Sequence, residues 1–541
     1  MRNFTKSRQM GGEQLIIIDE VAINYSDELS ILEICNRNHI PLPQMCSLGH
    51  LTPSGHCGLC VVELFDEAVP DHWIPVLACL LAPKKGIKIR TQSEMIAVIR
   101  EMAGLLILRS HPCDCNYCEN FGPCELRKIY NKTGFGFTRA IEDGKGKKTV
   151  ISCLSERFLL DREKCANCGL CVTYCREILG EDFLHSVLKD NDQSRLELYP
   201  GVKYGEGYLL NLIEICPFNA IIDEKSLGLP PSWQLQGFDG IATESSTGSN
   251  IKIFVQDNEI AHIKPRKNLN IGEIIPDISR DLHRRNETDR LDHMILHGQK
   301  VEERKLMLFF LPRIGFGHRC AMICNGSLSL ENMMLTRQLA DVLGARIFVK
   351  NRRQEGDDWL ISSDKNTNIR SALLTQMIKK EAVEDFNEIE DLISHNQIQT
   401  LIVLDEDVLS LGFSKENFAK VDSFTFSSHK NETTQNSHVA IPICTVFEEN
   451  GHFINRDFLL QRFHRAIIRK TEAKPLWEWL AMIKNIYTGR SGEAAEFQSI
   501  EAIWKFMEKL IPEFEKISFK DLPPEGIKLE NNRFKNFPFI A

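Results

Sequence analysis

The chain has 541 residues with 65 Lys and Arg, 74 Asp and Glu, and a formal net charge of −9. Its length corresponds to about three to five domains. With 43% apolar and 26% charged residues it has ordinary globular composition, which excludes a wholly disordered, collagen-like or coiled-coil protein. The negative charge gives no reason to expect binding to nucleic acid or to an anionic membrane surface. No apolar run approaches 18 residues, so we expect no membrane-inserted helix.

The cysteines are unevenly placed along the chain. Of the 18, fifteen lie between Cys35 and Cys216, and the others are Cys320, Cys324 and Cys444. The first residues lack the apolar stretch and cleavage site of a signal peptide, so a secreted disulfide protein is not expected. Clustered cysteines in such a chain indicate metal binding rather than disulfides. Cysteines two or three positions apart point to zinc or to iron–sulfur clusters.

The first predicted elements are a β-hairpin over residues 14–24 and a short helix that ends at Cys35. Ser26 and Asp27 have the residue types that cap a helix at its start. Cys35 lies on this helix, apart from the other cysteines. We therefore predict that it is a small buried residue and not a metal ligand.

The cysteines that follow form the first candidate site, with the spacing C-x10-C-x2-C-x18-C. The plant-type 2Fe–2S pattern is C-x4-C-x2-C with a distant fourth cysteine, and this sequence has the same order with a longer first loop. Gly55 and Gly58 would let backbone N–H groups approach the sulfurs. Zinc is the rival interpretation, although a zinc ribbon usually has two close pairs of ligands. The predicted ligands are Cys46, Cys57, Cys60 and Cys79.

The second candidate site follows a predicted helix over residues 93–110, where apolar residues recur at helical spacing. The segment SHPCDCNYCENFGPCEL offers more than four possible ligands, and three Cys with one His suit zinc as well as a cluster. The polar stretch EDGKGKK at 142–148 predicts an exposed loop or linker after this site. The possible ligands are His111, Cys113, Cys115, Cys118 and Cys124.

The third candidate site has the pattern of a bacterial ferredoxin. The run C-x2-C-x2-C is typical of a 4Fe–4S cluster, and in that pattern a further cysteine precedes a proline. Here Cys216-Pro217 supplies the distant cysteine, and no second run is present, so one complete cluster is expected. Cys153 and Cys175 are not assigned to any ligand set. The predicted ligands are Cys165, Cys168, Cys171 and Cys216.

After a predicted boundary at residues 228–231, strands and helices alternate, which predicts an α/β core. A capped helix is expected from Ser329 to Gly344. The sequence contains neither a GxGxxG motif nor a P-loop in this half. Short apolar or alternating runs predict strands at residues 251–255, 259–263, 306–311, 345–349 and 401–404.

The three sites, in this order, resemble those of the large iron–sulfur subunit of respiratory complex I. The resemblance is carried by the C-x10-C-x2-C loop, by HP-x-D-C-x2-C-x5-C from His111, and by CxxCxxCxxxCRE from Cys165. It implies a 2Fe–2S cluster at the first site and a 4Fe–4S cluster at each of the other two. It also implies that His111, Cys115, Cys118 and Cys124 are the ligands of the second site. The cysteines that are predicted not to bind a cluster are Cys35, Cys113, Cys153 and Cys175.

The C-terminal half is similar to a molybdopterin oxidoreductase domain, in residues 356–374, 430–443 and 447–463. Molybdenum enzymes carry a CxxCxxxC motif where such a domain begins. Here the corresponding region, IATESSTGSNI at 241–251, contains no cysteine. We therefore expect a domain that has lost its cofactor, with no fourth cluster, no molybdopterin and no flavin.

The resemblance implies an α/β multidomain fold. The expected parts are a β-grasp 2Fe–2S ferredoxin-like domain, a domain with a His-ligated 4Fe–4S cluster, a 4Fe–4S ferredoxin-like domain, and a degenerate molybdopterin-oxidoreductase-like α/β domain. Their predicted bounds are residues 10–92, 93–150, 151–228 and 229–541.

The function implied by the resemblance is electron transfer within an NADH:quinone oxidoreductase, a translocase. No catalytic acid–base pair or activated nucleophile is visible, so one-electron transfer by the clusters is the expected chemistry. The resemblance also implies that the chain itself binds neither NADH nor quinone. The implied partners are the NADH-binding flavoprotein subunit and other peripheral-arm subunits. The implied location is peripheral, on the cytoplasmic side of the membrane, within a membrane-bound complex.

Two alternatives remain open at this point. The first is the electron-transfer subunit of an NAD-linked hydrogenase or formate dehydrogenase, which shares the N-terminal modules. The second is a zinc-binding scaffold with no redox role.

Overall fold

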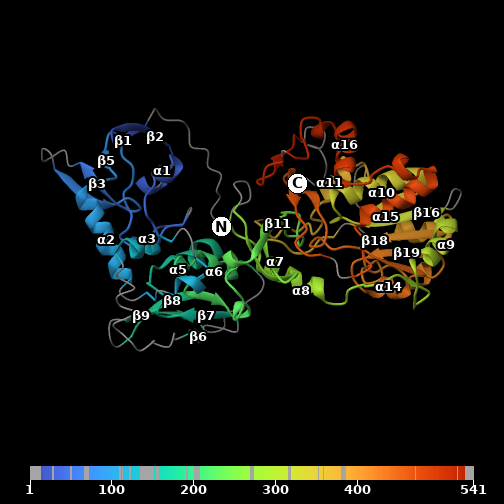
Figure 1. The fold of residues 1–541 in the computed structure, drawn as a ribbon, viewed down its shortest axis with the longest axis horizontal. Coiled ribbons are helices and arrows are strands. Elements are labelled where there is room, and N and C mark those ends of the chain that lie inside the picture. Colours follow the sequence, from blue (N-terminus) through green and yellow to red (C-terminus); the bar gives the residue numbers. More distant parts are fainter. Residues whose placement is uncertain are drawn as a thin grey trace. The chain divides into compact units, whose positions relative to one another are not determined.

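The computed structural model divides the chain into two compact units, residues 1–234 and 235–541, and each is taken by itself (Figure 1). The predicted bounds of the smaller domains stay predictions. The structure describes residues 14–26, 28, 30–48, 51–65, 72–108, 111–112, 114–120, 124–133, 151–153, 157–189, 193–199, 207–267, 273–314, 319–350, 352–357, 359–378, 386–468, 471–520 and 522–530. The predicted linker at 142–148 and the cysteine at 113 lie outside these residues.

The first unit begins with a β-grasp domain. Its sheet has the strand order β2-β1-β5-β3-β4, in which β1 and β5 are parallel and the other pairs are antiparallel. The predicted hairpin is confirmed, and α1 packs on the sheet through buried residues that include Ile31 and Ile34. The elements are β1 (Gln14–Ile18), β2 (Val21–Tyr25), α1 (Ile31–Arg37), β3 (Val61–Phe65), β4 (Trp73–Leu77) and β5 (Lys88–Arg90).

The predicted start of the first helix is wrong. Helix α1 begins at Ile31, where the Oγ atom of Ser30 accepts a hydrogen bond from the backbone N–H of Glu33 at 3.3 Å. Ser26 lies before the helix and its own N–H donates to a carboxylate oxygen of Glu28. Several polar residues of this segment can cap a helix, and tertiary packing selects which of them does.

The rest of the first unit is built from short elements, which leaves most of its functional side chains on loops. Gly104 of α2 packs directly against Ile129 of α3. The sheet order is β10-β7-β6, and β8 and β9 form an antiparallel hairpin. The elements are α2 (Glu94–Leu108), η1 (Cys115–Tyr117), α3 (Glu125–Thr133), β6 (Ile151–Cys153), β7 (Phe158–Asp161), α5 (Leu170–Tyr174), η2 (Cys175–Leu179), β8 (Leu184–Lys189), β9 (Gln193–Leu198), η3 (Leu209–Asn211), α6 (Leu212–Ile215), β10 (Ile221–Asp223), η4 (Glu224–Ser226) and η5 (Ser232–Gln234).

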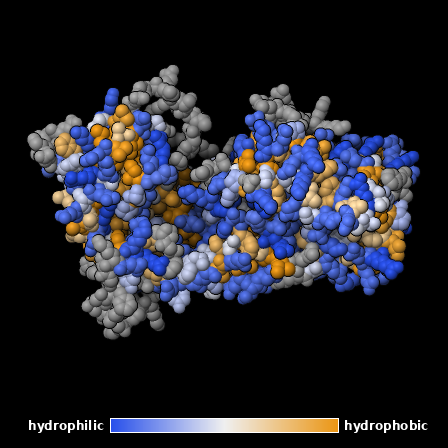
Figure 2. Space-filling model, turned by 45° about the horizontal axis from the view of Figure 1, so that its top comes forward, coloured by the Kyte–Doolittle hydropathy of each residue, from blue (hydrophilic) through white to orange (hydrophobic). Residues whose placement is uncertain are grey.

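Helix α2 carries the charged residues Glu94, Arg100 and Glu101, and its other residues are apolar on both the covered and the exposed side. Ile96, Gly104 and Leu108 are buried. Figure 2 shows hydrophobic patches on the surface of the molecule. The exposed apolar side chains of α2 are Met95, Val98, Met102 and Leu106. The helix is therefore anchored to its domain along one face.

The second unit is the predicted α/β domain. Its main sheet has the order β15-β14-β20-β19-β18-β16-β17, in which β16 to β20 are parallel. Alternate residues of β16 and β18 point into two separate cores, so helices cover both faces. The main-sheet strands are β14 (Ile295–Leu296), β15 (Gln299–Lys300), β16 (Cys320–Asn325), β17 (Arg346–Lys350), β18 (Thr400–Leu404), β19 (Asp422–Ser427) and β20 (Val439–Pro442).

The remaining elements surround this sheet. Two further sheets have the orders β11-β12-β13 and β21-β22-β23. Their strands are β11 (Gln236–Ile241), β12 (Asn250–Gln256), β13 (Glu259–Pro265), β21 (Gly451–Ile454), β22 (Leu459–Phe463) and β23 (Ile527–Lys528). The helices are α7 (Asp277–Arg280), α8 (Leu282–Glu287), α9 (Glu303–Ile314), α10 (Leu330–Leu343), α11 (Ile369–Leu374), α12 (Asn387–Ser394), α13 (Lys415–Phe418), α14 (Glu432–Asn436), α15 (Leu476–Thr488), η6 (Gly492–Ala494), α16 (Ile500–Leu510) and η7 (Pro512–Phe514).

One predicted strand of this unit is wrong. Residues 306–311 belong to helix α9, where Leu306 and Phe310 are buried and Leu308 is 71% exposed. That spacing is helical, and a six-residue apolar run cannot be assigned from its length alone. The other predicted strands fall in β12, β13, β17 and β18.

The capped helix predicted in this unit is confirmed as α10. The Oγ atom of Ser329 accepts a hydrogen bond from the N–H of Asn332 at 3.3 Å, and Gly344 ends the helix with φ +65°. In the part of the chain that the structure describes, no helix is both long and apolar enough to cross a membrane.

Candidate metal centres

The first candidate site is a loop between α1 and β3, closed by the turn after β4. The structure brings its predicted ligands together. The sulfurs of Cys46 and Cys57 are 3.3 Å apart, and the N–H of Cys57 donates to the sulfur of Cys46 at 3.4 Å. The pKa of Cys79 is raised, first by a hydrogen bond with Cys60, then by burial and by the charges of the other three cysteines. All four side chains are buried.

The backbone of this loop is shaped around the sulfurs. Gly55 and Gly58 adopt the left-handed conformation, with φ values of 72° and 66°. A Cβ atom at Gly55 would lie 2.7 Å from a methyl carbon of Leu80, so a larger residue would not fit there. The predicted role of these glycines, a close approach of the backbone, agrees with this geometry.

Hydrogen bonds between paired thiols favour the thiolate, which is the form that binds metal, at Cys46 and Cys60, and they raise the pKa of the partners Cys57 and Cys79. Hydrogen bonds, first from the Cys57 side chain and then from backbone N–H groups and Ser54, lower the pKa of Cys46 to about 5 despite its burial. A hydrogen bond from Cys79 lowers the pKa of Cys60 to about 7. Four buried sulfurs with N–H donors around them fit the thiolate set of a 2Fe–2S cluster.

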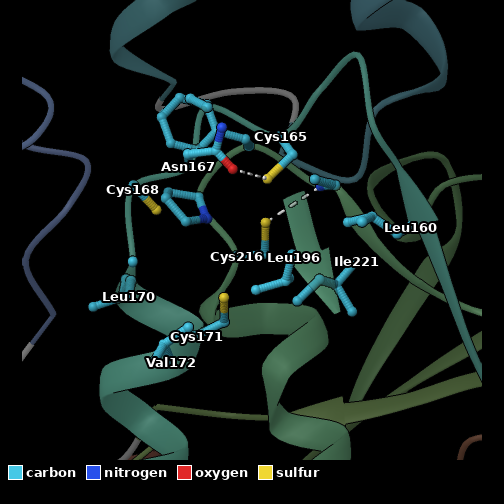
Figure 3. A pocket seen from close by; sticks show the side chains of 15 residues that line it. Leu160, Cys165, Asn167, Cys168, Leu170, Cys171, Val172, Leu196, Cys216 and Ile221 are labelled. Atoms are coloured by element: carbon cyan, nitrogen blue, oxygen red, sulfur yellow. Dashed lines mark hydrogen bonds between the residues drawn. The ribbon is translucent and has the colours of Figure 1, made fainter. Parts of the chain in front are cut away.

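The third candidate site is a cavity between β7, α5, α6 and β10. Figure 3 shows the sulfurs of its four predicted ligands turned toward this cavity. Apolar side chains complete the lining, among them Leu160, Leu196 and Ile221. Burial raises the pKa of Cys168 to about 12 and also raises that of Cys171. The ligands that line it are Cys165, Cys168, Cys171 and Cys216.

Left-handed turns aim backbone N–H groups at the sulfurs of the third site. Asn167, Gly169 and Asn219 have φ values of 51°, 74° and 50°. The N–H of Ala220 donates to the sulfur of Cys216 at 3.3 Å. Burial raises the pKa of Cys216, and N–H groups of residues 218–221 oppose that rise. Such concave sets of N–H groups bind anions, so the cavity fits the thiolates of a 4Fe–4S cluster.

The second candidate site consists of a short turn and the residue that leads into α3. Cys115 starts the turn η1, Cys118 ends it, and Cys124 precedes α3. Burial raises the pKa of both Cys115 and Cys118, and the charge of Cys124 adds to each rise. The N–H of Cys118 donates to the carbonyl of Cys115 at 3.2 Å, so the first two cysteines belong to one turn.

The His111 ring has one buried nitrogen that makes no hydrogen bond among the described residues. Burial lowers its pKa, and a hydrogen bond with the backbone of Lys164 opposes that shift. The Nδ1 atom is buried and has no hydrogen-bond partner among the described residues. A neutral ring that donates its one N–H to Lys164 leaves a free lone pair on Nδ1, which fits a metal ligand.

The third site is in contact with both of the others. The Oγ atom of Ser54, in the first-site loop, donates to the carbonyl of Cys168 at 2.5 Å, and the N–H of Thr52 donates to Glu177 at 3.0 Å. On the other side, Asn120 donates from Nδ2 to the carbonyl of Cys216 at 3.1 Å. Sequence reasoning missed these residues because no local spacing links segments that are far apart in the chain.

The remaining cysteines have different surroundings. Cys35 is buried in the core of the β-grasp domain, and burial raises its pKa to about 12. Cys175 is buried at the start of η2, close enough for its charge to raise the pKa of Cys171. Across the described ranges no three His, Cys, Asp or Glu side chains are arranged to hold a single metal ion.

Comparison with known proteins agrees with this geometry. Residues 16–84 match the 2Fe-2S iron-sulfur cluster binding domain, and residues 366–486 match the molybdopterin oxidoreductase family. The NADH-ubiquinone oxidoreductase 75 kDa subunit of Reclinomonas americana is 26% identical over 347 residues, which cover 61% of this chain and 48% of the relative. An NADH-quinone oxidoreductase subunit of Rickettsia prowazekii is 25% identical over 344 residues, covering 62% and 50%. The chain is therefore similar to subunits of NADH-ubiquinone and NADH-quinone oxidoreductases.

The chain spans about half or less of the length of these curated relatives. For the iron-sulfur protein 1 of Solanum tuberosum NADH dehydrogenase the identity is 25%, over 52% of this chain and 37% of the relative. This chain was also compared with solved structures. A crystal structure of an NAD+-reducing NiFe-hydrogenase in the H2-reduced state matches it with a TM-score of 0.33 and 20% sequence identity. The match covers 41% of this chain and 92% of the hydrogenase chain. The expected 2Fe–2S ferredoxin-type domain, the molybdopterin-oxidoreductase-like domain and the resemblance to the large iron–sulfur subunit are confirmed.

Proposed function

We propose that the chain is an iron–sulfur electron-transfer subunit of an NADH:quinone oxidoreductase. The observation that carries this proposal is the arrangement of the first unit, in which one central sulfur-lined cavity touches the loops of two other ligand sets. The names of the curated relatives, all NADH dehydrogenase subunits, agree with it.

The proposed cofactors are one 2Fe–2S and two 4Fe–4S clusters, with no molybdopterin, flavin or fourth cluster. When bound, the clusters supply one-electron chemistry, while the protein sets their spacing and potentials. The proposed 2Fe–2S ligands are Cys46, Cys57, Cys60 and Cys79. The proposed 4Fe–4S ligands are His111, Cys115, Cys118 and Cys124 at the second site, and Cys165, Cys168, Cys171 and Cys216 at the third.

The protein holds the ligand thiolates in buried surroundings and keeps the three sites close together. Backbone N–H groups at Cys57 and Ala220 stabilise negative charge on the ligand sulfurs. The contacts of Ser54 and Asn120 support a spatial order of first, third and second site, although the chain order differs. We propose that electrons follow this spatial order.

The proposed electron donor is the NADH-binding flavoprotein subunit, and other peripheral-arm subunits pass electrons on toward quinone. The chain would sit peripherally, on the cytoplasmic side of the membrane, within the membrane-bound complex. We propose domains at residues 10–92, 93–150, 151–228 and 229–541, the last acting as a scaffold.

Purification of the complex that contains this chain, under anaerobic conditions, tests the proposal. We expect a flavoprotein NADH dehydrogenase subunit to co-purify, and we expect this chain to contribute about ten iron and ten sulfide to the complex, the content of one 2Fe–2S and two 4Fe–4S clusters. Stoichiometric nickel, molybdenum or tungsten would instead support a hydrogenase or formate dehydrogenase. Zinc at the three sites, without iron–sulfur absorbance, would support the alternative of a zinc-binding scaffold with no redox role.

A further inference from the structure

The last three residues of the first unit, 232–234, form hydrogen bonds with the second candidate site, and we call these residues the strap. Their partners lie 113 to 118 positions earlier in the chain. The Nε1 atom of Trp233 donates to the backbone carbonyl of Cys118 at 2.9 Å. One strap residue therefore contacts a predicted cluster ligand directly.

The other two strap residues bind the same turn on either side of Cys118 in sequence. The Nε2 atom of Gln234 donates to the carbonyl of Asn116 at 3.1 Å. The backbone N–H and the Oγ atom of Ser232 both donate to the carboxylate of Glu119, and Oγ lies 2.6 Å from Oε2. Hydrogen bonds to an ionised carboxylate are stronger than those between neutral groups. The strap and the turn therefore run in opposite directions and pair residue by residue.

The sequence gives the strap a defined shape. It follows Pro230 and Pro231, whose rings fix the backbone φ angle near −65°. The strap itself is the single turn η5, in which the N–H of Gln234 donates to the carbonyl of Pro231 at 2.9 Å. Its donors are therefore held in place by a short and rigid segment.

Bonds from the strap fix the orientation of peptide groups in the second-site turn. In a trans peptide the carbonyl points away from the N–H of the next residue, so holding the carbonyl of Asn116 also holds the N–H of Tyr117. That N–H donates to the carbonyl of Asp114 at 2.9 Å, and the N–H of Cys118 donates to the carbonyl of Cys115 at 3.2 Å. The turn is thus closed by its own backbone and by the strap together.

We propose that the strap positions the second-site turn for cluster binding. Trp233 and Ser232 are positioning residues, because they act through the backbone of Cys118 and the side chain of Glu119. The turn has to open before its cysteines release a cluster, and the strap opposes that opening. The strap thereby sets how long the second site retains its cluster. This inference rests on the proposed function, since it needs a cluster at the second site.

The test is the rate at which an iron chelator removes each cluster from the whole purified complex, followed by electron paramagnetic resonance. Trp233→Phe keeps an aromatic ring and removes the indole N–H. Loss of one hydrogen bond between neutral groups should make the second-site signal decay about fivefold faster. Glu119→Gln removes the charge that Ser232 binds and should make this decay about tenfold faster. The other two signals should decay at the wild-type rate.

Two substitutions serve as controls. Trp359→Phe is the matched control, because Trp359 lies in the second unit and is 38% exposed, against 39% for Trp233. Tyr117→Phe is the local control, because it removes a hydroxyl from a side chain of the turn that is 79% exposed. Both should leave all three decay rates unchanged.

Unchanged decay of the second-site signal in Trp233→Phe or in Glu119→Gln would overturn the inference. Equal acceleration at all three sites would also overturn it, because the strap would then act on general stability. If a variant lacked only the second-site signal from the start, the strap would be needed to assemble that site, which supports the inference.

If one variant lost all three signals, the other variant would decide, and loss of all three in both would contradict the inference. A wild-type complex in which the second-site 4Fe–4S signal is absent would instead contradict the proposed function.

Discussion

The Nζ atom of Lys164 lies 2.7 Å from Oδ2 of Asp114, and this ion pair joins the loops of the third and second sites. Each residue directly precedes a predicted ligand, Cys165 in one loop and Cys115 in the other. The Lys164 side chain is only 6% exposed, and it also lies 3.9 Å from a carboxylate oxygen of Asp161. The backbone of Lys164 also forms a hydrogen bond with the His111 ring.

Lys164→Met should destabilise the protein by about 2 to 3 kcal/mol, because it leaves the buried Asp161 carboxylate without its cation. The two loops should also separate more easily, with partial loss of the second-site signal. Thermal unfolding and electron paramagnetic resonance of the purified complex measure both effects. Lys164→Arg keeps the charge and is the control, and equal behaviour of the Met and Arg variants would show that the ion pair is unimportant.

Ligand and spectator cysteines should respond differently to replacement by alanine. Cys115→Ala and Cys168→Ala should each abolish one 4Fe–4S signal, because a cluster loses one of its four ligands. Cys113→Ala and Cys175→Ala should keep the cluster content, although truncating the buried Cys175 should cost about 1 kcal/mol of stability. Iron content and resonance signals provide the measurement. Loss of a cluster in Cys113→Ala would overturn the ligand assignment at the second site.

His111→Cys should lower the potential of the second site by on the order of 100 mV, because a neutral ligand is replaced by a negatively charged thiolate. The expected direction follows from charge: an extra negative ligand disfavours the reduced form. A redox titration of this cluster measures the change, and the other two clusters serve as internal controls. A potential that stays the same or rises would show that His111 is not a ligand.

Stability should depend on pH through Glu449 in the C-terminal unit. Burial raises its pKa well above the ordinary range, and the charge of Glu331 adds to the rise. Because the pKa of Glu449 is higher in the folded chain, its contribution to stability is fully present below the unfolded pKa of about 4.5. That contribution is lost as the pH rises toward the folded pKa. Glu449→Gln should therefore stabilise the chain at pH 7 to 8, with a gain that shrinks toward pH 5.

The measurement is the difference in thermal unfolding midpoint between this variant and the wild type across that pH range. The neighbouring Glu448 forms an ion pair with Arg290 at 2.6 Å, so Glu448→Gln is the contrasting control and should destabilise the chain. A difference in unfolding midpoint between Glu449→Gln and the wild type that is the same at every pH would contradict the conclusion that burial raises the pKa of Glu449.

Local spacing was enough to predict much of the first unit. The hairpin over residues 14–24 and the close approach of Cys46 and Cys57 follow from residue patterns within one segment. The run at 306–311 was misassigned because its partners, which decide between strand and helix, lie elsewhere in the chain. The contact of Ser54 with Cys168 spans 114 residues, and only the folded chain brings such residues together.

The three-cluster assignment is tested most directly by the resonance spectrum of the reduced, anaerobically purified complex, compared with spectra of variants that each lack one ligand. We predict signals from one 2Fe–2S and two 4Fe–4S clusters, with Cys60→Ala, Cys118→Ala and Cys171→Ala each removing a different one. Signals that are absent from the wild type, or that persist in all three variants, would contradict the account.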